Sequence, residues 1–407
     1  MTETDAPQPD TAAPRVRRRK VFYLPGYDPM APRRYRELYR KQAGRQAAIS
    51  GYDITVKATS SKRANYSWHA EMVHDGARSE ADIEFLIWND IVQASMERSI
   101  FATYILMWRT LWIYMRSRTL SALYKMRPAP MIAALYPVFA LNLQLYFAWL
   151  IGEIIAWRLT GWIDTLVVCT TIACVLPIFR RYDRHIFAYY LLHDYAFSAQ
   201  FNGRTPPELR PRITDFAARV SAALDQDYDE VLVVGHSSGA HLAVEVLAKL
   251  LTERDVPAEK ELAFLTVGQV IPMISFLPDA NELRRDLNFL ARTENLTWVD
   301  VSAPSDGACF ALCDPVAVSG AKPAPEEDYG PKIISAAYTE TLSDETRRRI
   351  RFRFFRKHIQ YLYAFDQPRD YDYFQITAGP LSLKSRFGWR ESTASTVGDV
   401  YSRYTDF

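Results

Sequence analysis

The stretch Val231–Ala243 constrains the fold of this chain more than any other part of the sequence. It opens with the apolar run Val-Leu-Val-Val, which is typical of a strand buried on both faces. The small-residue turn Gly235–Gly239 follows and leads directly into an apolar helical pattern over Leu242–Leu251. A buried strand, a tight turn and a helix in this order predict an α/β fold in which helices flank a mostly parallel sheet.

The turn itself, Gly235-His236-Ser237-Ser238-Gly239, fits the pattern G-x-S-x-G. In that pattern a serine occupies a strained turn, and small residues on either side let neighbouring backbone approach. The Ser237 hydroxyl is then held above the edge of the sheet as a nucleophile. The following helix points its N-terminal amides at the same place, so the backbone N–H of Ser238 can donate to a developing oxyanion. The alternative is an ordinary glycine- and serine-rich turn between a strand and a helix.

At these residues the chain resembles the α/β-hydrolase superfamily, and the resemblance extends over Val21–Trp88 and about Asp183–Pro380. It implies an α/β-hydrolase fold and the chemistry of a serine esterase or lipase. In that superfamily a glycine-bearing loop after an early strand supplies the second oxyanion donor. Gly26 and Tyr27 follow the apolar run Val21–Leu24 and stand where that loop would be.

A candidate acid follows a later strand. Serine is a poor nucleophile at neutral pH, so a histidine must accept its proton and a carboxylate must orient that histidine. The order in the superfamily is serine, acid, histidine. Leu296–Ser302 is a predicted strand, and the loop at its end holds Asp306, where the resemblance places the acid. Asp300 and Asp314 are the alternatives, and each aspartate could instead be a turn or cap residue.

His358 is the only histidine downstream of that loop. It follows Ile350–Phe355, whose alternation of basic and apolar residues predicts a strand, so His358 is expected just past the strand's C-terminal end. His236 and His241 flank the serine too closely to serve easily as the base, and His236 is expected to line the pocket or pack beside the turn. The predicted triad is therefore Ser237, His358 and Asp306.

Two apolar segments, Met131–Trp157 and Trp162–Phe179, lie outside the resemblance. Their lengths suit helices that cross a hydrocarbon core of roughly 30 Å. Only Arg158–Gly161 separates them, so they predict a hairpin, with tryptophans near its turn as an interfacial belt. Basic residues flank the outer ends, which by the positive-inside rule places the rest of the chain in the cytoplasm. The alternative is a pair of buried helices that cap the active site.

The remaining pattern is consistent with one α/β domain interrupted by that hairpin. Ile91 to about Arg127 predicts one long helix rich in aromatic and basic residues, which suits either the headgroup layer of a membrane or a core helix with snorkelling arginines. The other expected elements are strand Val21–Leu24, helix Pro32–Arg45, strand Asp53–Ser61, a hairpin over Tyr66–His74 and Ile83–Trp88 with a turn of the Asp-Gly type at Asp75-Gly76, helix Ile213–Leu224, strand Leu262–Val267 and helix Asn281–Arg292.

Composition excludes some classes of function. The net charge of +2 argues against nucleic-acid binding driven by bulk charge, and 49% hydrophobic residues allow a large core. The four cysteines, Cys169, Cys174, Cys309 and Cys313, have no second metal-type cluster beside them. We therefore expect four buried thiols in a reducing compartment and neither a metal nor an organic cofactor.

These observations predict a membrane-anchored serine hydrolase, in an inner or plasma membrane, that acts on a small-molecule or lipid ester and contacts membrane lipids. The expected segments are a disordered tail over 1–20, the first part of the hydrolase domain over 21–127, the hairpin over 128–180, the second part over 181–380 and a C-terminal tail over 381–407. Two rival hypotheses are a catalytically inactive scaffold of the same fold and a soluble lipase-like enzyme with an apolar lid.

Overall fold

The computed structural model describes residues 15–59 and 66–407. Within these ranges eight strands form one sheet in the order β2-β3-β4-β1-β5-β6-β7-β8, and β3 alone runs antiparallel to both of its neighbours. The predicted α/β class with a mostly parallel sheet is confirmed. The strands are β1 (Arg18–Leu24), β2 (Asp53–Ala58), β3 (Tyr66–His74), β4 (Ala77–Phe85), β5 (Glu230–His236), β6 (Glu261–Val267), β7 (Leu296–Ser302) and β8 (Lys332–Ser335).

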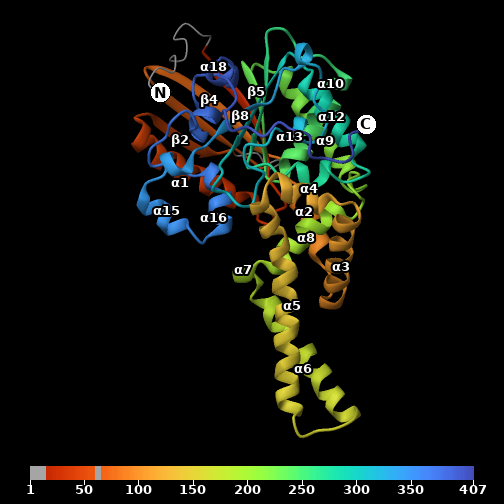
Figure 1. Ribbon diagram of the computed structural model, residues 1–407. Helices are drawn as coiled ribbons and strands as arrows, with labels where there is room; N and C mark the ends of the chain where they lie inside the picture. Colours follow the sequence, from red (N-terminus) through yellow and green to blue (C-terminus); the bar gives the residue numbers. More distant parts are fainter. Residues whose placement is uncertain (1–14, 60–65) are drawn as a thin grey trace.

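Helices cover both faces of the sheet (Figure 1). Successive side chains of a strand point to opposite faces, and β1 shows the result: Val21 and Tyr23 belong to one core, Phe22 and Leu24 to the other. Burying each such apolar side chain contributes roughly 1.5–3 kcal/mol. The first core is covered by α1 (Pro32–Ser50) and α17 (Tyr373–Ala378), the second by α9 (Arg210–Leu224), α10 (Gly239–Glu253) and α12 (Asn281–Ala291).

Short helices complete the body of the protein around the sheet. They are α11 (Pro272–Ser275), α13 (Pro315–Val318), η1 (Pro325–Glu327), α14 (Tyr338–Thr341), α15 (Asp344–Ile350), α16 (Phe354–His358), η2 (Gln360–Leu362) and α18 (Leu383–Phe387).

The predicted strand over Ile350–Phe355 is wrong, because these residues run from the end of α15 to the start of α16. Ser343 caps α15 by accepting a hydrogen bond from Thr346 N–H, and the first turn is acidic and the last turn basic. Both features favour a helix, since they satisfy free N–H groups and complement the helix dipole. The eighth strand is instead β8, which the sequence pattern did not indicate.

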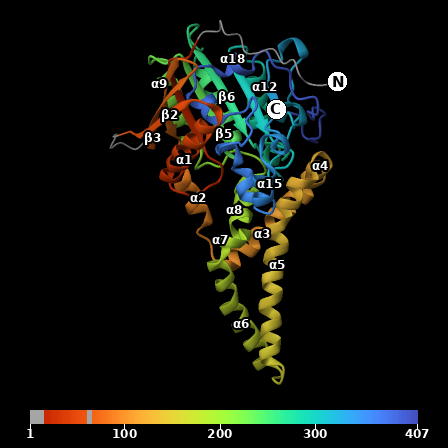
Figure 2. The same cartoon turned by 90° about the vertical axis from the view of Figure 1, so that its left-hand side faces the viewer.

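Two helices form a stalk that leaves the body (Figures 1 and 2). These are α5 (Pro128–Ala156) and α6 (Trp162–Arg181), which agree with the predicted hairpin to within three residues at each end. Gly152 lets them approach closely, because a Cβ atom there would lie 3.0 Å from Val168 Cα. At about 1.5 Å per residue α5 is roughly 43 Å long. Both helices are long and apolar enough to span a membrane.

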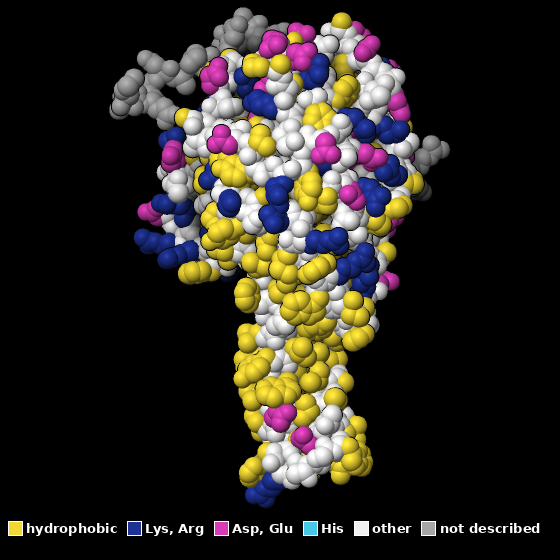
Figure 3. Space-filling model, turned by 45° about the vertical axis from the view of Figure 1, so that its right-hand side comes forward, with side chains coloured by type: hydrophobic (Ala, Val, Ile, Leu, Met, Phe, Trp, Pro, Cys, Tyr) yellow, Lys and Arg dark blue, Asp and Glu magenta, His cyan; other side chains and the backbone are white. Residues whose placement is uncertain are grey.

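The surface of this stalk is mostly hydrophobic, with Lys and Arg side chains near its junction with the body (Figure 3). In their most apolar windows only 22% of α5 and 11% of α6 is buried. The rest of the protein would cover helices of a buried core, but it leaves most of α5 and α6 exposed. Cys169 and Cys174 on α6 are exposed, so the expectation of four buried thiols was wrong for these two and holds only for Cys309 and Cys313.

Five further helices lie around the base of the stalk. The long helix predicted from Ile91 to Arg127 is in fact α2 (Asn89–Met96), α3 (Ile100–Arg116) and α4 (Thr119–Met126). It breaks where Ser99 caps α3 by accepting from Ala102 N–H, and again where Arg118 adopts a positive φ of 57°. After α6 the chain forms α7 (Asp183–Ile186) and α8 (Ala188–Ala199), and α8 packs against both α3 and α5.

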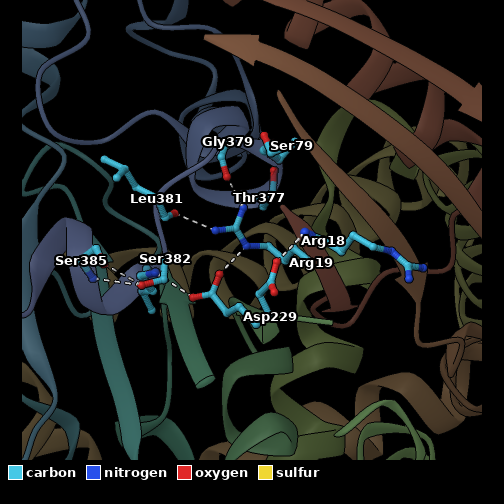
Figure 4. Close-up of polar contacts among 12 residues, drawn as sticks. Arg18, Arg19, Ser79, Asp229, Thr377, Gly379, Leu381, Ser382 and Ser385 are labelled. Carbon is cyan, nitrogen blue, oxygen red and sulfur yellow. Dashed lines mark hydrogen bonds and ion pairs between the residues drawn. The ribbon is translucent and has the colours of Figure 1, made fainter. Parts of the chain in front are cut away.

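The first and the last described segments of the chain are tied to the body. Arg18–Lys20, which we expected in the disordered tail, begin β1, and residues 1–14 lie outside the described ranges. The buried Arg19 pairs with the buried Glu230 and donates to the carbonyl oxygens of Gly379 and Leu381, as Figure 4 shows for the two carbonyls. The segment expected as a C-terminal tail contains α18 and is packed, since the Arg284 side chain donates to the Asp406 carbonyl at 3.0 Å.

Candidate active site

Ser237 lies in the turn between β5 and α10 with a positive φ of 57°. Non-glycine residues rarely adopt this region, and such strain costs of order 1–3 kcal/mol. The packing around the turn enforces it: a Cβ atom on Gly239 would lie 2.4 Å from the Pro25 carbonyl oxygen, and one on Gly26 would lie 3.0 Å from Ser237 Cβ. The glycines of the motif therefore let the loop after β1 close onto the serine, as the pattern predicts.

Asp306 and His358 are brought together from distant parts of the chain. Asp306 follows β7, His358 is the last residue of α16, and His358 Nδ1 lies 2.9 Å from Asp306 Oδ2. Both residues are buried. Asp306 Oδ1 also accepts from Ala308 N–H at 3.0 Å, which fixes the orientation of the carboxylate.

Each partner shifts the pKa of the other in the direction that favours the charged form. Burial alone would raise the pKa of Asp306, but the attraction and hydrogen bond of His358 outweigh it and lower the pKa. Burial alone would lower the pKa of His358, and the Asp306 carboxylate reverses this and raises it. A carboxylate held in this way stabilises an imidazolium, which is the state that a histidine reaches on accepting a proton from serine.

Ser237 lies next to this pair through its neighbour His236. The rings of His236 and His358 stack with centroids 5.2 Å apart, and His236 Nε2 donates to the His358 carbonyl oxygen at 3.3 Å. His236 Nδ1 lies 3.2 Å from the Tyr23 hydroxyl. Burial, assisted by the charge of His358, lowers the pKa of His236 to about 3. His236 therefore stays neutral and packs beside the turn, one of the two positions expected for it.

In the structure the Ser237 hydroxyl makes no hydrogen bond with the His358 ring, whose hydrogen bond among the described residues is to Asp306. Because Nδ1 is taken by Asp306, Nε2 is the nitrogen left for the serine. Hydrogen bonds between a nucleophile and its base are often long in proteins without substrate and tighten when substrate binds.

The three residues expected to bind an oxyanion surround Ser237. Tyr27 N–H donates to Ser238 Oγ at 2.7 Å, and Gly26 packs against Ser237 Cβ and Ser238 Oγ. Ser238 is the N-cap of α10, where backbone N–H groups lack partners within the helix. The Ser238 hydroxyl thus lies between the two proposed backbone donors. Sequence analysis did not assign a role to this side chain.

Asp300 and Asp314, the alternative acids, have other partners. Asp300 is buried within β7 and accepts from Thr266 Oγ1 at 2.6 Å. Asp314 caps α13 by accepting from Val316 and Ala317 N–H groups, and it also pairs with Lys322. Neither contacts His358, so the geometry favours Asp306 over both.

Tyr361 is a site residue that sequence analysis missed. Its hydroxyl donates to Asp306 Oδ2 at 3.0 Å and accepts from Ala303 N–H at the same distance. The side chain is fully buried, and the sulfur of Cys309 lies 3.6 Å from the hydroxyl. Tyr361 thus binds Asp306 Oδ2, the same carboxylate oxygen that contacts His358. Its position three residues after the histidine is the only signal in the sequence.

Asp194 on α8 is a second missed residue. It lies close enough to His358 for its charge to raise the pKa of the imidazole. Burial raises the pKa of Asp194 to about 7, against the opposing effect of His358. Tyr190, one turn earlier on the same helix face, donates to the Tyr27 carbonyl oxygen. This face of α8 therefore joins the base of the stalk to the serine turn.

In the described part of the chain, no group of three or more His, Cys, Asp or Glu side chains is placed to hold a metal ion. The arrangement can supply a strained serine, a histidine with a buried carboxylate partner, and several N–H and O–H donors. Comparison of the chain with protein-family models, with curated proteins and with solved structures found no match.

Proposed function

We propose that this protein is a membrane-anchored serine hydrolase of the α/β-hydrolase fold that cleaves hydrophobic esters. The observation that supports it best is the placement of Ser237, at positive φ between β5 and α10, beside the 2.9 Å contact of Asp306 with His358. The parallel sheet with helices on both faces is compatible with that fold. A strained serine next to a buried carboxylate–histidine pair is the arrangement that acyl transfer requires.

In the first half of the reaction Ser237 Oγ attacks the carbonyl carbon of the ester. His358 Nε2 accepts the serine proton, and Asp306 stabilises the imidazolium that forms. The tetrahedral intermediate then collapses, and His358 gives its proton to the departing alcohol. In the second half water attacks the acyl-serine, His358 accepts a proton from that water, and the carboxylic acid leaves as Ser237 regains its hydrogen.

The oxyanion would be bound by the backbone N–H groups of Ser238 and Tyr27 in the loop that Gly26 allows to close. Tyr27 N–H is engaged by Ser238 Oγ at 2.7 Å, so the Ser238 hydroxyl must either rotate away or donate its own hydrogen to the oxyanion while still accepting from Tyr27. The two backbone N–H groups are fixed in place before substrate arrives, and such preorganised donors each contribute roughly 3–4 kcal/mol in enzymes of this class.

The stalk supports the membrane part of the proposal. A lid should cover the site, whereas α5 and α6 extend away from the body (Figure 2). Basic residues at the body end of the stalk, Lys125, Arg127, Arg180 and Arg181, outnumber the single Arg158 at its turn, so the positive-inside rule favours a body in the cytoplasm. A site at the base of a membrane anchor favours lipids or other hydrophobic esters as substrates.

Hydrolysis of p-nitrophenyl esters of increasing acyl length, by the protein purified in detergent, tests this function. We expect turnover that Ser237→Ala abolishes, a loss of at least about 10³-fold. Ser275→Ala is the matched control, because Ser275 is also buried but bonds to Ser319 away from the site. Equal rates in wild type and Ser237→Ala would contradict the proposal.

A catalytically inactive scaffold is the second candidate. It is favoured by one observation, namely that Ser237 is not hydrogen-bonded to His358 while Tyr27 N–H is already occupied. A folded protein that hydrolyses none of these esters and forms no acyl-serine would support this scaffold.

A further inference from the structure

A pocket of about 260 Å³ lies between α1 and the α15–α16 segment. Five of the side chains that line it are cationic, and none of its described lining residues is acidic. We call it the arginine pocket; its principal members are Lys41, Arg45, Arg349, Arg353, Arg356 and Tyr363.

Most of these cations lack a counter-charge. Arg45 pairs with Asp366 at 2.9 Å, but among the described residues the other four cations have no ion pair. The Arg356 guanidinium lies 3.3 Å from the centre of the Tyr363 ring, and its Nη1 is buried with no hydrogen-bond partner. Burial lowers the pKa of Arg356 to about 10, and the charges of Arg349 and Arg45 act in the same direction. The pocket is therefore organised as a binding site for an anion.

The pocket lies at the end of the body from which the stalk leaves. Figure 1 shows α15 and α16 at that end, and Figure 2 shows α15 there as well. Phe355 packs on Phe187 and Tyr190, with ring centroids 4.2 and 5.4 Å apart, which ties the segment to the helices that follow the hairpin. Between the arginines, Phe352 is 83% exposed and Phe354 is 55% exposed.

An exposed phenylalanine among unpaired arginines, at the end of the body from which the stalk leaves, matches the chemistry of an anionic lipid surface. Arginine binds phosphate oxygens in pairs, and an apolar ring beside it gains free energy by entering the acyl region. A soluble phosphate would use the arginines but leave the exposed Phe352 without a role. The combination therefore points to a lipid headgroup.

We propose that the arginine pocket binds the phosphate of an anionic lipid while Phe352 inserts among the neighbouring acyl chains. This proposal rests on the membrane anchoring proposed above. It assigns the body a second contact with the bilayer, besides the hairpin. Arg356 and His358 belong to the same short helix, so a bound headgroup would hold the helix that carries the histidine at the membrane surface.

The experiment uses the full chain in lipid nanodiscs of phosphatidylcholine, titrated with phosphatidylglycerol. Phe352→Cys carries an environment-sensitive fluorophore, with the exposed Cys169 and Cys174 changed to serine. We expect the emission to shift to the blue, and quenching by aqueous iodide to fall, as phosphatidylglycerol is added. Arg349→Gln with Arg353→Gln should raise the phosphatidylglycerol content needed for half the shift by about fivefold for each charge removed. Both arginines are exposed, so the variant should fold.

Arg78→Gln with Arg292→Gln is the matched control, because these exposed arginines lie at the opposite end of the strands and should leave the titration unchanged. An unchanged midpoint in the pocket variant would overturn the proposal, as would an equal shift produced by inorganic phosphate in pure phosphatidylcholine discs. Failure of the chain to enter nanodiscs would instead contradict the membrane anchor. Ester hydrolysis is not measured here, so the catalytic proposal is tested independently.

Discussion

Replacing Tyr361 with phenylalanine removes one hydroxyl from the site and leaves the buried ring in place. That hydroxyl donates to Asp306 Oδ2 at 3.0 Å and accepts from Ala303 N–H at 3.0 Å. A hydrogen bond to a charged group contributes about 1.5–3 kcal/mol, and a buried N–H left without a partner costs about 1–3 kcal/mol. The variant should therefore be less stable than the wild type and should hold Asp306 less firmly.

The effect on reactivity follows from the charge on Asp306. With one donor fewer, the carboxylate attracts the His358 proton more strongly and raises the pKa of the imidazole further. We expect part of the free energy of the lost hydrogen bond to appear as a change in the pKa of His358. At about 1.36 kcal/mol per pKa unit, this part corresponds to an upward shift of about 0.5–1 unit. A general base works only when neutral, so activity should begin at higher pH, and the rate near neutral pH should fall roughly three- to tenfold.

The assay is the rate of Ser237 modification by a fluorophosphonate probe as a function of pH. Tyr39→Phe serves as the control, since Tyr39 is equally buried and its hydroxyl lies 2.8 Å from Thr377 Oγ1, on another helix. This control should keep the wild-type pH profile. If Tyr361→Phe kept both the wild-type rate and the wild-type midpoint, Tyr361 would have no part in holding Asp306.

Three further predictions follow. Asp194→Asn removes a negative charge that raises the pKa of His358, so the midpoint of the same pH profile should move to lower pH, and an unmoved midpoint would show that Asp194 does not act on the histidine. Gly26→Ala places a Cβ atom 3.0 Å from Ser237 Cβ, and at an overpacking cost of roughly 1–3 kcal/mol it should slow labelling about tenfold or more, measured against Gly44→Ala, where a Cβ meets nothing within 4 Å. The two exposed cysteines of α6 should resist a polar maleimide in intact membranes and react after denaturation; rapid reaction in intact membranes would place α6 in water.

The elements that the sequence predicted well are those with a local physical cause. The apolar run before Ser237 and the small residues around it specify a buried strand and a tight turn without help from the rest of the chain. The hairpin follows from the length of its two apolar runs, and Asp75-Gly76 predicts the turn between β3 and β4, where both residues have positive φ.

The failures have two kinds of cause. Alternation over Ile350–Phe355 indicated a strand, but Ser343 caps α15, and the acidic first turn and basic last turn of that helix complement its dipole. Tyr361 and Asp194 were not foreseen, because their roles depend on which elements fold against His358. The sequence pattern around a single polar residue does not reveal which distant residue its hydroxyl or carboxyl group will contact.

Labelling of the membrane fraction with a fluorophosphonate probe, followed by mapping of the modified peptide, examines the proposed catalytic serine itself. We predict a single adduct, on Ser237, that is absent in the Ser237→Ala variant. The His358→Ala variant should be labelled more slowly by orders of magnitude, because no base remains to accept the serine proton. The proposed enzyme would be contradicted if a folded, membrane-inserted wild type stayed unlabelled. It would also be contradicted if the His358→Ala variant were labelled as fast as the wild type.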